Sequence, residues 1–176
     1  MKTFKPKFNI GQNNNQTLKL IPLGGVGDVT KNMYVYEFGN DILLIDCGVG
    51  FPDEAMPGID LVIPDISYLR NKKDKIKAIL ITHGHDDHIG GLPYIWPELQ
   101  VPIYSQKLTC GFIKAKFSEH NLPKNKIFEV SINDQLNLGV FGVSFYQVAH
   151  SIPDSTGIVI QTPVGTIIHQ ADFKID

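Results

Sequence analysis

Three histidines and two aspartates are concentrated in the segment His83-Gly84-His85-Asp86-Asp87-His88, and this segment most constrains how the chain can fold. It follows directly on the largely apolar run 76–81. An apolar run of this length, bounded by turn residues, predicts a buried strand. Beyond the histidines, apolar residues recur at helical spacing, so we expect Asp87 and His88 to open a helix. These apolar residues are Ile89, Leu92, Ile95 and Trp96.

The residue types in this segment predict a metal site. His83 and His85 lie two positions apart at the end of an extended segment, so their side chains can point to the same side. Asp87 and His88 follow after the chain turns into the helix. Imidazoles with a carboxylate suit zinc, manganese or iron better than calcium or magnesium. These ligands exceed what one tetrahedral site with an open position normally takes from a single segment, which favours two adjacent metals. We interpret Asp86 as a helix-capping residue.

Asp46 closes the apolar run 42–45 and needs a partner, because a buried unpaired charge is costly. A hydrogen bond to a metal-bound histidine, or to the turn before His83, would satisfy it. The alternative is that Asp46 caps a turn before Gly48. We favour the hydrogen bond that supports the metal site.

Two more candidate ligands stand at predicted strand ends. His150 follows the strand 143–148, and Asp172 follows the strand 165–169, so both can converge on the histidine cluster. His169 is expected to point along its strand and is not assigned to the site.

The remaining pattern predicts alternating strands and helices. Strands are expected over 18–23, 33–38, 42–46, 101–104, 126–130, 135–138 and 157–162, and helices near 66–70 and over 107–120. Residues 72–77 are expected to form a solvated linker. Strands clustered at both ends around helices predict a mixed α/β layered sandwich.

Composition sets limits on this fold. With 176 residues, 43% hydrophobic and 19% charged, the chain predicts one globular domain preceded by a mobile arm over 1–16. The net charge of −2 gives no electrostatic argument for nucleic acid. Cys47 and Cys110 lack metal-type spacing and predict free thiols. No apolar run spans a bilayer and no signal peptide is recognised, so a cytoplasmic location is expected.

The pattern His-x-His-x-Asp-His is similar to the signature of the metallo-β-lactamase superfamily. The flanking segments narrow the resemblance to the ribonuclease J family, and the similarity runs from about residue 20 to residue 176. These segments are Leu23-Gly24-Gly25-Val26-Gly27-Asp28, Lys31-Asn32-Met33-Tyr34, Leu44-Ile45-Asp46-Cys47-Gly48, Phe51-Pro52, Gly58-Ile59-Asp60, Ile63-Pro64-Asp65-Ile66 and His150-Ser151-Ile152-Pro153-Asp154-Ser155.

The resemblance implies a metallo-β-lactamase αββα sandwich with its first half present and its second half missing. Residues 17–176 would be the N-terminal part of that domain. It also implies two divalent metals, with zinc expected and manganese as the alternative. Asp172 would bridge the two metals, and Asp87 would both bind a metal and orient the nucleophile's proton. The first metal would be held by His83, His85 and His150, and the second by Asp87 and His88.

The resemblance further implies a metal-dependent ribonuclease that hydrolyses RNA phosphodiesters with a hydroxide activated by two metals. The expected activity is 5′-to-3′ exonucleolytic, endonucleolytic or both, in rRNA processing and mRNA decay. The general acid and the 5′-phosphate pocket would lie in the missing part. A half-sandwich would expose an apolar sheet face, so we expect a homo-oligomer or a completing chain beside the RNA substrate. Two alternatives stay open, a superfamily hydrolase of a small ester, lactone or thioester, and a non-catalytic interaction module.

The chain departs from the family pattern at three positions. Asp28 stands where Glu is usual, and Thr30 and Ala171 stand where Gly is common. Ala171 adds a Cβ beside Asp172, which is tolerable if its φ is negative.

Overall fold

The computed structural model describes residues 17–175, and the arm predicted over 1–16 lies outside the described residues. Two sheets organise the chain. The larger sheet has the strand order β1-β2-β3-β4-β5-β6, and the smaller has the order β10-β9-β8-β7. The strands of the larger sheet are β1 (Lys19–Gly24), β2 (Met33–Phe38), β3 (Asp41–Ile45), β4 (Ile76–Leu80), β5 (Ile103–Ser105) and β6 (Ile127–Glu129). Those of the smaller are β7 (Gln135–Leu138), β8 (Phe141–Gln147), β9 (Thr156–Thr162) and β10 (Gly165–His169).

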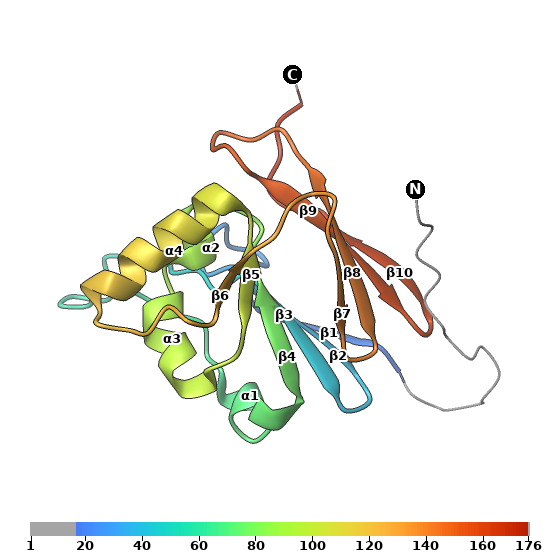
Figure 1. Ribbon diagram of the computed structural model, residues 1–176. Helices are drawn as coiled ribbons and strands as arrows, with labels where there is room; N and C mark the ends of the chain where they lie inside the picture. Colours follow the sequence, from blue (N-terminus) through green and yellow to red (C-terminus); the bar gives the residue numbers. More distant parts are fainter. Residues whose placement is uncertain (1–16, 176) are drawn as a thin grey trace.

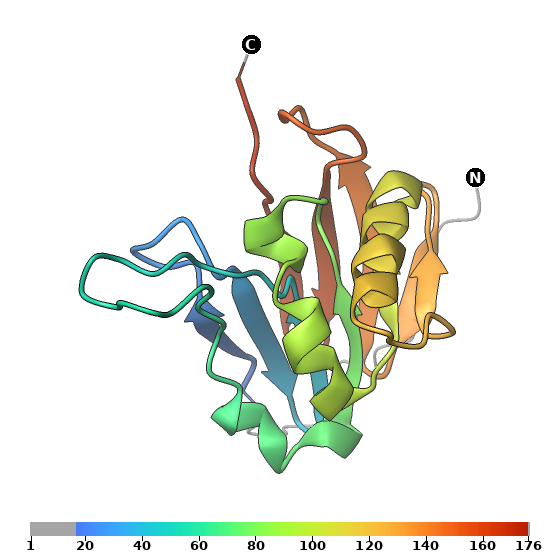
Figure 2. The same cartoon turned by 90° about the vertical axis from the view of Figure 1, so that its left-hand side faces the viewer.

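The helices cover one face of the larger sheet, and the smaller sheet covers its other face (Figures 1 and 2). The helices are α1 (Ser67–Arg70), α2 (Asp86–Ile89), α3 (Leu92–Leu99) and α4 (Lys107–Glu119), with a 3-10 turn η1 (Lys73–Lys75). Strand β3 is buried on both faces, since Ile42 and Leu44 join the core under the helices while Leu43 and Ile45 join the core between the sheets. Such two-sided burial is typical of strands that read as continuous apolar runs.

Strand direction explains where the predicted site residues meet. Strand β4 pairs parallel to β3 and to β5, whereas β1, β2 and β3 form an antiparallel meander. Parallel neighbours end at the same edge of a sheet, so Asp46 after β3 and His83 after β4 leave the sheet side by side. Ligands of open α/β sheets commonly bind at this edge.

The helix expected to continue from His88 is broken in two, contrary to the prediction. Helix α2 ends at Ile89, and α3 begins at Leu92. The reason is the Gly90-Gly91 pair, where the amide of Gly91 bonds to the carbonyl of Cys47 at 2.8 Å. The break lets the chain after β3 insert against the end of α2.

The linker predicted over 72–77 is also wrong in part. It contains η1 and the first residues of β4. The ammonium of Lys72 lies 2.8 Å from a carboxylate oxygen of Glu37, whose side chain is 8% exposed, and 3.6 Å from the centre of the Tyr68 ring. The sequence does not signal this contact, because Glu37 lies on a distant strand.

The outer face of the smaller sheet is mixed in character, whereas an apolar face was expected. Since Phe145, Val143 and Ile160 point into the core between the sheets, their neighbours along β8 and β9 point outward. Outward positions alternate between polar and apolar types, and of the large apolar ones only Ile168 is strongly exposed, at 65%. These outward residues are Ser144, Tyr146, Val159, Gln161 and Ile168. Among the described residues, no helix is both long and apolar enough to cross a bilayer.

Candidate metal centre

Backbone hydrogen bonds join three distant segments beneath the histidine cluster. The amide of Asn32 bonds to the carbonyl of Asp87 at 2.9 Å, and the amide of Cys47 bonds to the carbonyl of His88 at 2.8 Å. The approach is so close that a Cβ at Gly48 would lie 1.6 Å from the carbonyl oxygen of Asp87. Only glycine fits there. The start of α2 is therefore fixed by backbone contacts with the segments that carry Asn32 and Cys47.

The structure brings three predicted ligands into one group, namely His83, His85 and His150. The Nε2 of His83 lies 3.0 Å from the Nδ1 of His85, and the Nε2 of His150 lies 3.2 Å from the same Nδ1. A tetrahedral zinc with nitrogen ligands at about 2.0–2.1 Å holds them about 3.3–3.4 Å apart. The group therefore fits a metal ion with little adjustment.

A second group adjoins the first and consists of His83, His88 and Asp172. The Nε2 of His88 lies 3.6 Å from Oδ2 of Asp172 and 3.4 Å from Oδ2 of Asp87. The same Asp172 oxygen is 3.9 Å from the Nε2 of His150. Asp172 thus lies between the two groups, where a shared ligand would stand.

Asp46 and Thr82 orient two of the histidine rings. The buried carboxylate of Asp46 accepts the backbone N–H of Thr82 at 2.9 Å, the Thr82 hydroxyl at 2.9 Å, and the Nδ1 hydrogen of His88 at 2.8 Å. Because the Thr82 hydroxyl donates its own hydrogen to Asp46, its oxygen accepts the Nδ1 hydrogen of His83, at 3.0 Å. Both rings therefore carry a hydrogen on Nδ1, so Nε2 is the atom that would bind a metal, the arrangement typical of metal-bound histidines.

Two residues at this centre were missed by sequence reasoning. Thr82 acts through its hydroxyl, and a threonine inside an apolar run gives no signal of its own. Asn32 is buried, and its amide nitrogen lies 3.2 Å from Nε2 of His88 and 3.0 Å from the carbonyl of Val29. Its position directly before β2 and behind the glycine-rich turn could have suggested a role, since such turns approach ligands closely.

Charge is distributed unevenly over the centre. Burial lowers the pKa of His88, but Asp46, Asp172 and Asp87 outweigh it and raise this pKa to about 12. Burial and the charge on His88 lower the pKa of His83 to about 4. The hydrogen bond from His88 and nearby positive charge lower the pKa of Asp172 to about 2. Burial raises the pKa of Asp87, yet His88 brings it below its usual value. The carboxyl groups of Asp87 and Asp172 are therefore ionised at neutral pH.

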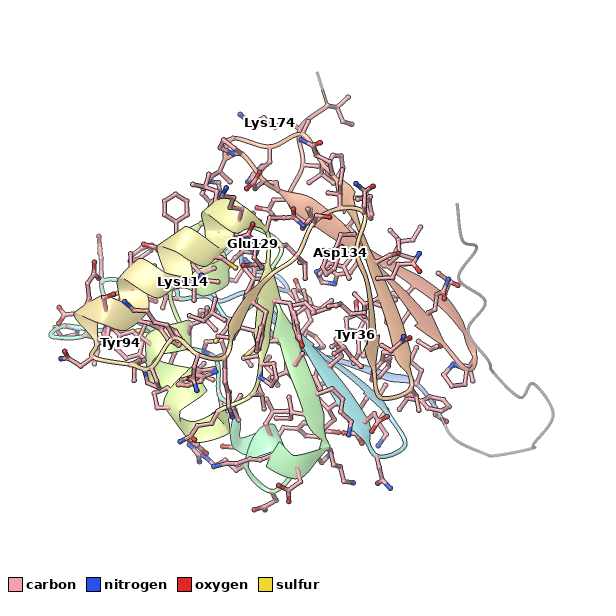
Figure 3. The ribbon with its side chains drawn as sticks, in the orientation of Figure 1. Tyr36, Tyr94, Lys114, Glu129, Asp134 and Lys174 are labelled. Atoms are coloured by element: carbon pink, nitrogen blue, oxygen red, sulfur yellow. The ribbon has the colours of Figure 1, made fainter. Side chains whose placement is uncertain are left out.

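A cavity of about 260 Å³ opens beside His88 and Asp172, between the edges of the two sheets. His169 lines it, with Nδ1 3.0 Å from the Tyr36 hydroxyl and its ring edge-on to Tyr34. The side chain therefore faces the space between the sheets, where Figure 3 places Tyr36, and does not point along the strand as expected. His169 belongs to neither ligand group.

The three residues that depart from the family pattern, and the expected helix cap, also have defined positions in the structure. Asp28 accepts the amide and hydroxyl hydrogens of Thr30, both at 2.9 Å, so two of the departures from the family pattern contact each other. The φ of Ala171 is not positive, so the Cβ that it adds beside Asp172 is tolerated as expected. Asp86 lies in the first turn of α2 and pairs with Lys116 of α4 at 2.6 Å, while His85 holds the N-cap position expected for Asp86. Cys47 and Cys110 are buried free thiols.

The metallo-beta-lactamase superfamily model matches residues 26–174. The chain belongs to this superfamily. Its expected fold is confirmed, and a crystal structure of a protein of unknown function from Enterococcus faecalis V583 superposes with a TM-score of 0.69 at 18% identity, over 90% of this chain and 44% of that one. The metallo-beta-lactamase fold protein YhfI from Bacillus subtilis gives a TM-score of 0.58 at 18% identity, over 86% and 61% of the two chains.

The resemblance to ribonuclease J is confirmed as well. A ribonuclease J from Thermus thermophilus is 45% identical over 90% of this chain, and one from Helicobacter pylori is 43% identical over 97% of it. Ribonuclease J 2 from Staphylococcus aureus is 42% identical over 92%. The chain spans 25–29% of the length of these curated relatives. Family and histidine cluster together indicate a hydrolase fold with a site for divalent metals.

Proposed function

We propose that the chain is part of a metal-dependent ribonuclease that hydrolyses RNA phosphodiester bonds. The observation that carries the proposal is the convergence of His83, His85 and His150, beside His88 and Asp172, in a chain 42–45% identical to ribonucleases J. A small-molecule hydrolase of the same superfamily could share the histidines. The identity to ribonucleases J over nearly the whole chain favours RNA as the substrate.

In this proposal two divalent cations, zinc or alternatively manganese, are held by the adjoining groups. His83, His85 and His150 would hold one cation, Asp87 and His88 the other, and Asp172 both. The imidazole nitrogens and carboxylates are the donors that these metals prefer. The fit is supported by the nitrogen separations of 3.0 and 3.2 Å in the first group.

Bound cations would supply Lewis acidity and a nucleophile at neutral pH. The residues of the chain would orient the ligands and accept the proton. Asp46 and Thr82 hold the rings of His88 and His83 with Nε2 facing the reacting centre. Asp87, whose pKa lies below its usual value, stays a carboxylate, and its Oδ2 can accept the nucleophile's proton. Asp172, with Oδ2 3.6 Å from Nε2 of His88 and 3.9 Å from Nε2 of His150, adds negative charge where the two groups meet and would hold both cations.

The test measures metal content and cleavage of single-stranded RNA labelled at its 5′ end, using the full-length protein that carries this sequence. His150→Ala removes one ligand, and His120→Ala is the matched control, because His120 caps α4 and packs edge-on against Tyr94. We expect the wild type and His120→Ala to bind metal and cleave RNA, and His150→Ala to lose about 10²-fold or more in rate.

The outcomes separate the alternatives. Turnover of a small ester or thioester with intact RNA would replace the ribonuclease by the small-molecule hydrolase. Metal binding without any hydrolysis would favour the interaction module. The length of the labelled products decides between exonuclease and endonuclease action. Native mass spectrometry tests the proposed homo-oligomer or completing chain, and fractionation of cells tests the proposed cytoplasmic location.

A further inference from the structure

The loop between β8 and β9, residues 148–155, carries His150. We propose that Asp154 is a positioning residue that holds His150 in the metal centre by fastening this loop to the start of α4. The inference rests on the proposed metal centre, and it concerns a side chain that itself stands outside both ligand groups.

The contact is a single well-formed hydrogen bond between distant segments. Oδ2 of Asp154 accepts the backbone N–H of Leu108, in the first turn of α4, at 2.9 Å. The N-cap residue Gln106 makes no side-chain capping bond, and the first turn contains no acidic residue. Asp154 therefore provides the negative charge and the acceptor that a helix start favours. The loop and the helix stabilise each other through it.

His150 depends on its loop more than His83 and His88 depend on theirs. His83 and His88 are oriented through Nδ1, by Thr82 and Asp46 respectively. The Nδ1 of His150 is buried and has no hydrogen-bond partner among the described residues. Metal-bound histidines usually have such a partner. Without one, the ring of His150 is placed by the backbone that carries it.

The other hydrogen bonds of the loop do not join it to α4. The amide of Val148 bonds to the carbonyl of Ser155 at 3.0 Å, and the Ser155 hydroxyl bonds to the carbonyl of Ile152 at 2.9 Å, both within the loop. The amide of Lys174 bonds to the carbonyl of Ala149 at 2.7 Å and brings the segment after Asp172 alongside (Figure 3). Among the side-chain hydrogen bonds of the described residues, the one from Leu108 to the carboxylate of Asp154 connects the loop to α4.

The backbone of Asp154 explains why an aspartate suits this position. Its φ is +61°, in the left-handed region that Asp, Asn and Gly tolerate best. Asp154→Asn keeps this conformation and an acceptor oxygen. Asp154→Gly keeps the conformation and removes the acceptor. The two variants therefore separate the hydrogen bond from backbone strain.

The experiment titrates the metal-free protein with cobalt(II), followed by visible absorption, and measures urea unfolding in chelator. Asp65→Gly is the matched control, because Oδ1 of Asp65 accepts the amide of Ser67 at 2.8 Å at the start of α1, near the opposite end of β4 (Figure 1). We expect Asp154→Gly to weaken cobalt binding about tenfold or more and to alter the absorption of the bound ion. Asp154→Asn should restore both, and Asp65→Gly should change neither.

Each result decides between distinct possibilities. If Asp154→Gly is destabilised but binds cobalt like the wild type, the inference is overturned and Asp154 is only a helix cap. If Asp154→Asn fails to restore binding, the hydrogen bond is not the cause. If the wild type binds no cobalt, the proposed metal centre itself is refuted, and the inference fails with it.

Discussion

Asp46 offers the sharpest test of how the metal centre is supported. Its carboxylate is 1% exposed and accepts hydrogen bonds from the amide and hydroxyl of Thr82 and from Nδ1 of His88. In Asp46→Ala the hydroxyl can rotate to another acceptor, but the amide of Thr82 and the ring of His88 lose theirs. Each buried donor left unsatisfied costs about 1–3 kcal/mol. The free energy of unfolding of Asp46→Ala should therefore be lower by about 3–5 kcal/mol, which is the usual cost of removing one partner of a buried ion pair.

Asp46→Asn separates stability from metal binding. Its amide oxygen can still accept the amide hydrogen of Thr82, so we expect a smaller loss of about 1–2 kcal/mol. Its NH₂ group cannot accept the Nδ1 hydrogen of His88, so the hydrogen bond that keeps a hydrogen on Nδ1 of this ring is lost. Metal affinity should then fall about 10–100-fold.

The assay combines urea unfolding in chelator with zinc competition against a chromophoric chelator. Asp134→Ala is the control, because Oδ2 of Asp134 accepts the amide of Ser131 at 2.8 Å on an exposed turn. Its unfolding free energy should change by about 0.5 kcal/mol or less. The reasoning is refuted if Asp46→Ala costs no more than Asp134→Ala, or if Asp46→Asn binds zinc as tightly as the wild type.

Three further outcomes are expected. Burial raises the pKa of Glu37, but hydrogen bonds, the largest from Lys72, lower this pKa from 4.5 to about 2. The ionised Glu37 therefore stabilises the fold by about 3 kcal/mol. This stabilisation is fully present above pH 4.5 and is lost as the pH falls towards 2. The difference in urea unfolding between wild type and Glu37→Gln should shrink accordingly, and a constant difference would contradict this. Gly48→Ala should cost about 3 kcal/mol or more in thermal unfolding, because its Cβ would meet the carbonyl of Asp87. The pKa of His88 is raised to about 12, so zinc must displace a proton from this ring in order to bind. The zinc affinity measured by competition should therefore rise about tenfold per pH unit near neutrality. A zinc affinity that does not change with pH would contradict this prediction.

The sequence predicts those parts of the centre that depend on residue type and on strand ends. The spacing of His83 and His85 after an apolar run, and a carboxylate closing another run at Asp46, were sufficient to place these residues at one edge of a sheet. Parallel pairing of β3 and β4 then brings them together.

The contacts that the sequence does not reveal are those made by backbone atoms or by residues of ordinary type. The amide of Gly91 bonds to Cys47, which breaks the predicted helix. The hydroxyl of Thr82 joins Asp46 to His83 only because β3 and β4 end side by side. No periodicity or residue type marks either contact, since each depends on the tertiary arrangement.

The hydrogen bonds of the centre connect residues that are far apart along the chain, and this has a consequence for synthesis. Asp46 and His88 are separated by 42 positions, His85 and His150 by 65, and Tyr36 and His169 by 133. A ribosome adds about 5–20 residues per second, so the histidine segment emerges on the order of ten seconds before Asp172. During that interval the early histidines have neither the late ligands nor β10 beside them. The complete ligand set of the proposed metal centre is therefore assembled only after β10 has formed, and before that the early histidines offer a passing ion an incomplete site.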